Sequence, residues 1–162
     1  MIITMYQIDA FTSELFHGNP AAVCPLDAWL PDDVMQAIAE ENNLAETAFF
    51  IREDGQFHIR WFTTVCEVDL CGHATLATAH ALFHHEGYIG ESLTFSSRSG
   101  PLHVRRSGDL LILDFPDQLF QQILGGDQPA QAPVFVDHQR HLQMALLHLA
   151  QANDAYWHGL FG

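Results

Sequence analysis

A cysteine and a histidine flank a glycine at Cys71-Gly72-His73, where a strand-like segment gives way to a long row of small apolar residues. A helix that begins at Gly72-His73 offers unpaired backbone N–H groups and the positive end of its dipole. Glycine also lets a ligand approach the main chain closely. The motif therefore predicts a cradle for a carboxylate or another oxyanion. The alternative is that Gly72 only allows the chain to turn into the helix and that the motif binds no ligand.

Cys71 could itself do chemistry, because a thiolate beside a helix N-terminus has a lowered pKa and can abstract a proton or act as a nucleophile. The alternative is a buried cysteine that packs as a small hydrophobic residue. Cys24 and Cys66 lie on predicted strands, and we interpret both as core or edge residues. Three cysteines without CxxC spacing predict neither a disulfide framework nor a structural zinc site.

Glu46 is a second candidate for chemistry, in the segment NNLAETAFF. On a strand, Glu46 shares its face with Leu44, Ala48 and Phe50, so an ionisable group lies in an apolar row. Desolvation would raise its pKa and suit the carboxyl group to carry a proton near neutral pH. The simpler alternative is a glutamate at a sheet edge that reaches water.

Two groups of histidines have spacings that could bind a metal ion. His80 and His84 lie one helical turn apart, but no HExxH glutamate accompanies them and their helix is predicted to be interior. His138, His141 and His148 recur along one side of another predicted helix, where a solvated polar face explains them as well. We therefore expect no metal site.

The charge balance excludes some partners. Six basic residues, all arginine, oppose 20 acidic ones, which gives a formal net charge of −14. Such a surface repels phosphate backbones, so we expect no nucleic-acid binding. No apolar run could span a bilayer and the N-terminus lacks the charged start of a signal peptide, so we expect a cytoplasmic protein that does not enter membranes. The 11 histidines predict that stability varies with pH.

Alternating hydrophobicity between turn residues predicts the strands that hold these side chains. The predicted strands are 2–9, 21–24, 44–51, 57–63, 92–97, 102–107 and 110–115. Asp54-Gly55 is a strong hairpin signal between the third and fourth of them. The first two are predicted to form a hairpin-like entry across a Gly-Asn-Pro turn.

Helical spacing predicts two helices in the same region. Pro31 and two aspartates open the first, and Asn42-Asn43 would end it. The second begins at His73, is apolar or small nearly all the way round, and ends before Gly87, so we expect it to be buried on every side.

The order of these elements favours a curved mixed sheet wrapped around a central buried helix over a doubly wound parallel sheet. The predicted class is α+β, with one lobe over residues 1–116. Residues 117–162 form a divergent tail with a helix predicted at 137–154. The tail ends in apolar residues that either pack back on the lobe or cover a partner subunit. These residues are Tyr156, Trp157, Leu160 and Phe161.

Four segments, in this order and spacing, resemble the N-terminal half of the PhzF-like isomerases of phenazine biosynthesis. They are DAFTSELFHGNPAAVC, ENNLAETAFF, RWFTTVCEVDLCGHATLATAHAL and SRSGPLHV, and the resemblance covers about residues 5–116. That family is related to diaminopimelate epimerase and proline racemase. Its members have two similar lobes, each a sheet wrapped around a central helix, so the resemblance implies a diaminopimelate-epimerase-like lobe.

The resemblance also implies an activity and its residues. Glu46 would be the general acid/base of a cofactor-independent isomerase that moves a proton on a small carboxylate-bearing metabolite. His73 would help bind and orient this anionic substrate. The other substrate-binding residues implied are Gly72, Ala74 and Thr75, through their backbone N–H groups, and Asn19, which lies near the same cleft in relatives.

Two other functions stay open. The related racemases use a cysteine at the position of Cys71, so a cysteine-dependent epimerase is one alternative. The family's second lobe supplies an EDPxTGxA segment and an aspartate that complete the cleft, and neither is matched here. The other alternative is therefore a non-catalytic small-molecule-binding lobe. We expect a homodimer in which the apolar tail or the cleft face is buried between two chains.

Overall fold

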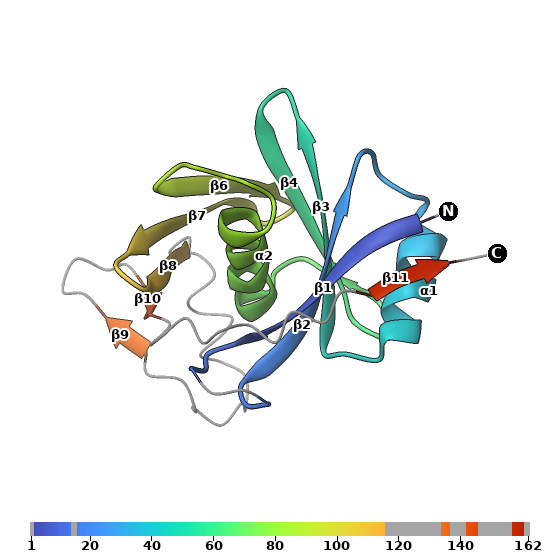
Figure 1. Cartoon of the computed structure of the whole chain (residues 1–162), viewed down its shortest axis with the longest axis horizontal. Helices are drawn as coiled ribbons and strands as arrows, with labels where there is room; N and C mark the ends of the chain where they lie inside the picture. The colour runs from blue at the N-terminus through green and yellow to red at the C-terminus, as the bar shows by residue number, and fades with distance from the viewer. Residues whose placement is uncertain (1, 14–15, 116–133, 137–141, 146–156, 161–162) are drawn as a thin grey trace.

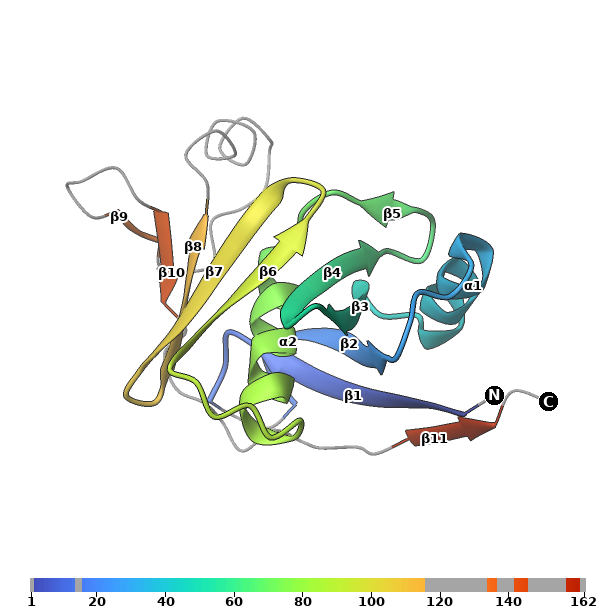
Figure 2. The same cartoon turned by 90° about the horizontal axis from the view of Figure 1, so that it is seen from above.

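The computed structural model of the chain describes residues 2–13, 16–115, 134–136, 142–145 and 157–160. A strongly curved sheet bends around helix α2 (Gly72–His84), while helix α1 (Asp32–Asn42) lies outside the curve (Figures 1 and 2). This arrangement confirms the α+β class and the central helix predicted from the sequence. Neither helix in the described part of the chain has the length and apolar character needed to cross a lipid bilayer.

All strands in the described residues join one sheet, in the order β11-β1-β2-β3-β4-β6-β7-β8-β10-β9, with β5 beside β4. The strands are β1 (Ile2–Ala10), β2 (Asn19–Leu26), β3 (Glu46–Glu53), β4 (Gln56–Phe62), β5 (Glu67–Val68), β6 (Ser92–Ser97), β7 (Gly100–Ser107), β8 (Leu110–Phe115), β9 (Val134–Val136), β10 (Leu142–Ala145) and β11 (Trp157–Leu160). Strands β1 and β2 pair antiparallel, as predicted. Parallel pairing of β2 with β3 and of β4 with β6 makes the sheet mixed.

Helix α1 crosses over between the parallel strands β2 and β3. It begins after Pro31, and Asp32 and Asp33 place negative charge in its first turn, where the helix dipole favours it. It ends at Asn43, which adopts the left-handed conformation with φ of 50°. Both predicted ends of the helix are confirmed.

The hairpin between β3 and β4 turns on two residues with positive φ. Asp54 has φ of 50° and Gly55 has φ of 81°, as a two-residue type I′ turn requires. Glu53 pairs with Gln56 across this turn. The predicted Asp-Gly hairpin is confirmed, and it fixes the register along the whole of β3.

Strand β3 separates two apolar clusters. Ala48 and Phe50 belong to the cluster around α2, whereas Phe49 packs on the opposite face with Met35 of α1. Successive side chains of a strand point to opposite faces. Glu46, two residues before Ala48, therefore lies on the side of the sheet that holds α2, as the sequence predicts.

Helix α2 fills the hollow of the sheet. Every residue from His73 to Phe83 is buried, which confirms the prediction of a helix covered on all sides. Thr75 and Thr78 are the threonines of this stretch, and each hydroxyl donates to the carbonyl four residues earlier, at 2.5 and 2.7 Å. These bonds let the helix carry threonine in an apolar core without an unsatisfied hydroxyl group.

The end of α2 is closed by the predicted glycine. Gly87 has φ of 68°, a left-handed conformation that costs glycine little. The N–H of Tyr88 donates to the carbonyl of Leu82 at 3.0 Å. This bond reaches one residue further back than the bond of a Schellman ending, and it satisfies a carbonyl of the last turn of the helix.

The tail corrects one prediction. Residues 142–145, within the helix predicted at 137–154, form strand β10, which pairs antiparallel with β8. Pairing with the edge of β8 outweighs the helical pattern there, and the rest of that predicted helix lies outside the described residues. Strand β11 (Trp157–Leu160) pairs with β1, so this part of the tail returns to the lobe. Tyr156 and Phe161 lie outside the described residues.

Candidate active site

A carboxyl group, a thiol and an imidazole meet at the N-terminus of α2. Nε2 of His73 lies 3.2 Å from Oε2 of Glu46, and Nδ1 of the same ring lies 3.4 Å from Sγ of Cys71. One potential ligand atom from each residue lies within 4.8 Å of the other two. The structure thus brings together the three side chains that the sequence indicated for chemistry.

Glu46 reaches this place because β3 begins there. It pairs with Ala21 in the parallel register between β2 and β3. Asn19 starts β2 two residues before Ala21 and so lies at the same end of the sheet. Its predicted part in substrate binding stays a prediction.

The start of α2 positions the other two side chains. Cys71 is the residue before the helix, with extended backbone (φ −147°, ψ 116°), and its thiol faces the N–H groups of His73 and Ala74. The N–H of Thr75 already donates to the carbonyl of Cys71 at 3.2 Å. Of the backbone donors that the resemblance implies, the N–H of Thr75 is therefore engaged within the helix.

Burial raises the pKa of Glu46, and a hydrogen bond from the Cys71 thiol partly opposes this rise. Its side chain is 21% exposed, so it is not the solvated edge residue of the simpler interpretation. Oε2 is buried without a hydrogen bond, because the nearby Nε2 of His73 is close but not aligned for one. The raised pKa agrees with the prediction from the apolar row on β3.

His73 is held in its neutral form. Its burial lowers the pKa to about 4, although the carbonyl of Pro20 favours the protonated ring. The ring of Phe11 covers one side, with centroids 6.5 Å apart. A neutral imidazole has one N–H donor and one acceptor nitrogen, so His73 can donate to an anion without carrying a charge of its own.

Of the two interpretations of Cys71, the structure supports the buried cysteine and contradicts the thiol with a lowered pKa. Burial, followed by the negative charge of Glu46, raises the pKa of the Cys71 thiol to about 12, and these effects outweigh the N–H groups at the helix start. A helix terminus lowers the pKa of a thiol only where desolvation and a nearby carboxylate do not oppose it. Cys24 is also buried, as predicted for a core residue. Cys66 is exposed and lies between β4 and β5, so its prediction as a strand residue is wrong.

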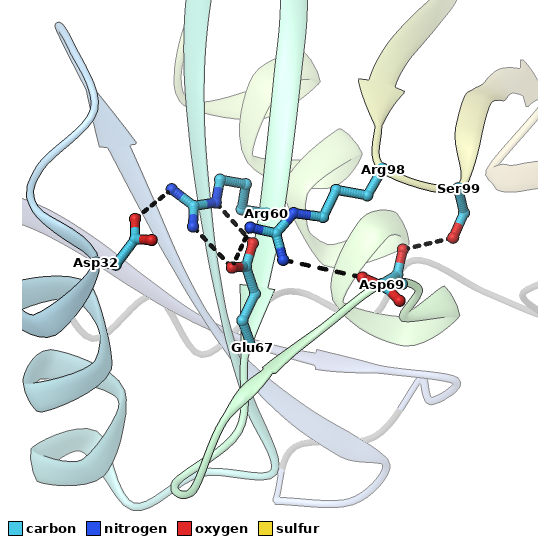
Figure 3. A network of polar contacts seen from close by, with 6 residues as sticks. All are labelled: Asp32, Arg60, Glu67, Asp69, Arg98 and Ser99. Carbon is cyan, nitrogen blue, oxygen red and sulfur yellow. Dashed lines mark hydrogen bonds and ion pairs between the residues drawn. The ribbon is translucent and has the colours of Figure 1, made fainter.

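A network of charged side chains holds the segment that leads into Cys71 (Figure 3). Arg60 on β4 donates two hydrogen bonds to Glu67 on β5, from Nε to Oε1 at 2.6 Å and from Nη2 to Oε2 at 2.7 Å. Nη1 of Arg60 also reaches Oδ1 of Asp32, at the start of α1, at 2.9 Å. Paired bonds of this kind are among the stronger polar contacts in proteins.

The turn between β6 and β7 completes this network. Nη2 of Arg98 lies 2.8 Å from Oε2 of Glu67, and Oγ of Ser99 donates to the carbonyl of Asp69 at 2.8 Å. The segment just before Cys71 is thereby held by β4 and by the turn between β6 and β7, and Arg60 links it further to α1. We did not predict this network, and the only signal in the sequence is opposite charge on segments whose pairing is unknown beforehand.

The other histidine groups do not form a three-ligand cluster in the described residues. His80 and His84 stack with their ring centroids 4.3 Å apart. Burial, followed by the charges of neighbouring basic groups, lowers the pKa of His80 to about 3. His138, His141 and His148 lie outside the described residues.

A cavity of about 820 Å³ lies towards the other end of α2. Leu82, Gly87 and Tyr88 line it, together with Arg52 and residues of β1. Glu46, Cys71 and His73 do not, so this cavity is separate from the three reactive side chains.

A curved mixed sheet closed around an apolar helix is the fold of epimerase-like and racemase-like proteins. The structure superposes on a hydroxyproline epimerase from Agrobacterium vitis with a TM-score of 0.51, over 70% of this chain and 41% of that one. The sequence identity is 7%, so this similarity concerns the fold alone. The chain belongs to the PhzC-PhzF family of phenazine biosynthesis-like proteins, whose model matches residues 8–157.

Two relatives show how much of such a protein the chain represents. An uncharacterized isomerase of Pseudomonas aeruginosa is 60% identical over 116 residues, which are 72% of this chain and 45% of that protein. The crystal structure of a PhzF-family protein from Enterococcus faecalis matches with a TM-score of 0.70 and 53% identity, over 72% of this chain and 45% of that one. The chain thus spans less than half the length of these two relatives.

Proposed function

We propose that this lobe serves a cofactor-independent isomerase that moves a proton on a small carboxylate-bearing molecule, with Glu46 as the general acid/base. The observation that carries the proposal is the partly buried Glu46 carboxyl group beside a neutral imidazole at a helix N-terminus. Its raised pKa suits a group that must both take and return a proton near neutral pH. Membership of a family whose relatives are named as isomerases supports the same reaction class.

Each group of the cluster has a part in this proposal. The Glu46 carboxylate removes a proton from one carbon of the substrate and returns it to another, so the enzyme ends in its starting state. Nε2–H of His73 donates a hydrogen bond to an oxygen of the substrate and stabilises the negative charge that develops on it. The positive end of the α2 dipole attracts the carboxylate of the substrate. Cys71, whose proton is held firmly by its raised pKa, serves as a neutral neighbour.

A non-catalytic binding lobe is the second candidate function. The specific observation in its favour is that the chain spans 45% of the length of its isomerase relative. The same helix start would then bind a carboxylate without proton transfer.

In the catalytic proposal, two copies of the chain associate so that each site is covered. A monomer at micromolar concentration in analytical ultracentrifugation would contradict that pairing.

Solvent exchange tests the proposal. Dihydro-3-hydroxyanthranilate, a small carboxylate-bearing compound, serves as the test substrate. It is incubated with the protein in D₂O, and deuterium incorporation is followed by NMR. We expect exchange with the parent chain, none with Glu46→Gln, and normal exchange with the control Glu41→Gln on the exposed end of α1. Exchange that survives Glu46→Gln but stops with Cys71→Ala would refute the glutamate mechanism. Binding without any exchange would favour the binding lobe.

A further inference from the structure

We propose that Glu46, Cys71 and His73 form a binding site for a thiophilic divalent cation such as Zn²⁺, and that the bound cation shuts off the acid–base site. The binding half of this proposal stands on the geometry alone. The inhibition half rests on the proposed function, since it requires Glu46 to be the proton carrier.

The separations of the three side chains approach those of a zinc site. Zinc binds thiolate at about 2.3 Å and imidazole or carboxylate at about 2.0–2.2 Å, so tetrahedral ligand atoms lie roughly 3.3–3.7 Å apart. Nε2 of His73 lies 3.2 Å from Oε2 of Glu46, whereas the 3.4 Å contact of Sγ of Cys71 is to the other ring nitrogen, Nδ1. With one ligand atom from each residue, all three atoms lie within 4.8 Å of one another. Side-chain movements of about 1 Å would bring all three onto one ion.

Two of the potential ligand atoms lack a hydrogen-bond partner in the described part of the chain. Oε2 of Glu46 and Nε2 of His73 are both buried without a hydrogen bond, and the His73 side chain is only 9% exposed. Buried polar atoms without a partner are costly. A cation bound between these residues would remove that cost.

The chemistry of the set selects the class of cation. Thiolate and imidazole ligands favour zinc and similar metals over magnesium or calcium, which prefer oxygen ligands. Binding releases the Cys71 proton to solvent. One thiolate, one carboxylate and one neutral imidazole then carry two negative charges, which a divalent cation neutralises in this buried place. No electron is transferred, and a fourth position stays open.

The same atoms cannot serve a cation and a substrate proton together. A Glu46 carboxylate that binds the cation shares its negative charge with the metal and becomes a much weaker base for the substrate proton. A His73 nitrogen that binds it can no longer donate to the substrate. Zinc should therefore act as a reversible inhibitor that a chelator removes.

Cobalt binding tests the site independently of any activity. Co²⁺ is titrated into the reduced full chain, and the thiolate-to-cobalt absorption and the intense visible bands of tetrahedral Co²⁺ are recorded. We expect one equivalent to bind, and Zn²⁺ to displace it. Glu46→Gln and His73→Asn should each weaken binding by about tenfold or more, and Cys71→Ser should remove the thiolate band. The matched control Cys66→Ser, which changes the exposed thiol, should bind as the parent does.

The outcomes separate this proposal from the proposed function. A thiolate-to-cobalt band that survives Cys71→Ser and disappears with Cys66→Ser would overturn the site. Co²⁺ affinity that is unchanged in both Glu46→Gln and His73→Asn would overturn it as well. Circular dichroism of each variant checks that the lobe is folded. Proton exchange that zinc leaves unaffected would refute inhibition while leaving the isomerase intact. Cobalt binding with the expected ligand dependence, but without exchange by the parent, would retain the metal site and refute the isomerase.

Discussion

Replacing Arg60 by methionine should destabilise the lobe far more than an ordinary surface substitution. Arg60 and Glu67 have side chains that are 16% and 13% exposed, so their paired hydrogen bonds lie mostly out of water. Methionine keeps much of the aliphatic volume against Trp29 and Phe62, whose rings lie 5.4 and 5.2 Å from the guanidinium carbon. The change therefore removes mainly the charge and its hydrogen bonds.

The expected magnitude follows from what Glu67 retains. Removing one partner of a buried ion pair costs about 3–5 kcal/mol, because the other charge stays buried and uncompensated. Exposed pairs are worth about 0.2–1 kcal/mol. Arg98 still contacts Glu67 at 2.8 Å, but its side chain is 54% exposed. We therefore expect Arg60→Met to lower the free energy of unfolding by about 2–3 kcal/mol.

Urea unfolding of a double-mutant cycle measures this effect. The double variant Arg60→Met/Glu67→Gln should lose less than the sum of the single variants, by about 1–2 kcal/mol, because each change removes the same interaction. Arg52→Met, at an exposed arginine on β3, is the matched control and should change little. A loss below about 1 kcal/mol for Arg60→Met, or strict additivity in the cycle, would show that water screens this pair and that the reasoning is wrong.

Two further predictions follow from the buried ionisable groups. The pKa of His80 is about 3 in the folded chain and about 6.5 when exposed, so between these values only the unfolded chain takes up the proton. The free energy of unfolding should therefore decrease as the pH is lowered from 6.5 to 4, by up to about 1.4 kcal/mol per pH unit. Urea unfolding of His80→Gln should show a smaller decrease over the same pH range. Equal slopes for the parent and the variant would contradict the assignment. Iodoacetamide should alkylate exposed Cys66 well before Cys71, whose pKa is about 12; mass spectrometry of timed digests measures the order, and the reverse order would disprove the raised pKa.

The parts of the fold that could be predicted from the sequence are those with local causes. Asp54-Gly55 specifies its hairpin because both residues tolerate positive φ. Helix α2 was recognisable because small apolar residues run all the way round it between a Gly-His start and Gly87. The face of Glu46 follows from the two-residue period of a strand.

The errors and omissions concern interactions between distant segments. The pKa of Cys71 depends on Glu46, which only the folded sheet brings beside it. Strand β10 depends on the edge of β8, and the Arg60–Glu67 pair depends on the pairing of β4 with β5. No local pattern contains this information, because each partner is chosen by the tertiary fold.

The surroundings of α2 also bear on how the chain is made. The apolar cluster around this helix draws residues from β1 to β4, which precede it, and from β6 to β8, which follow it, as far as Leu113. A nascent chain that emerges from the ribosome with only its first 90 residues would carry the helix with one side uncovered. The lobe therefore cannot complete its core during synthesis until β8 has left the exit tunnel, and over that interval one apolar side of the helix stays exposed to water.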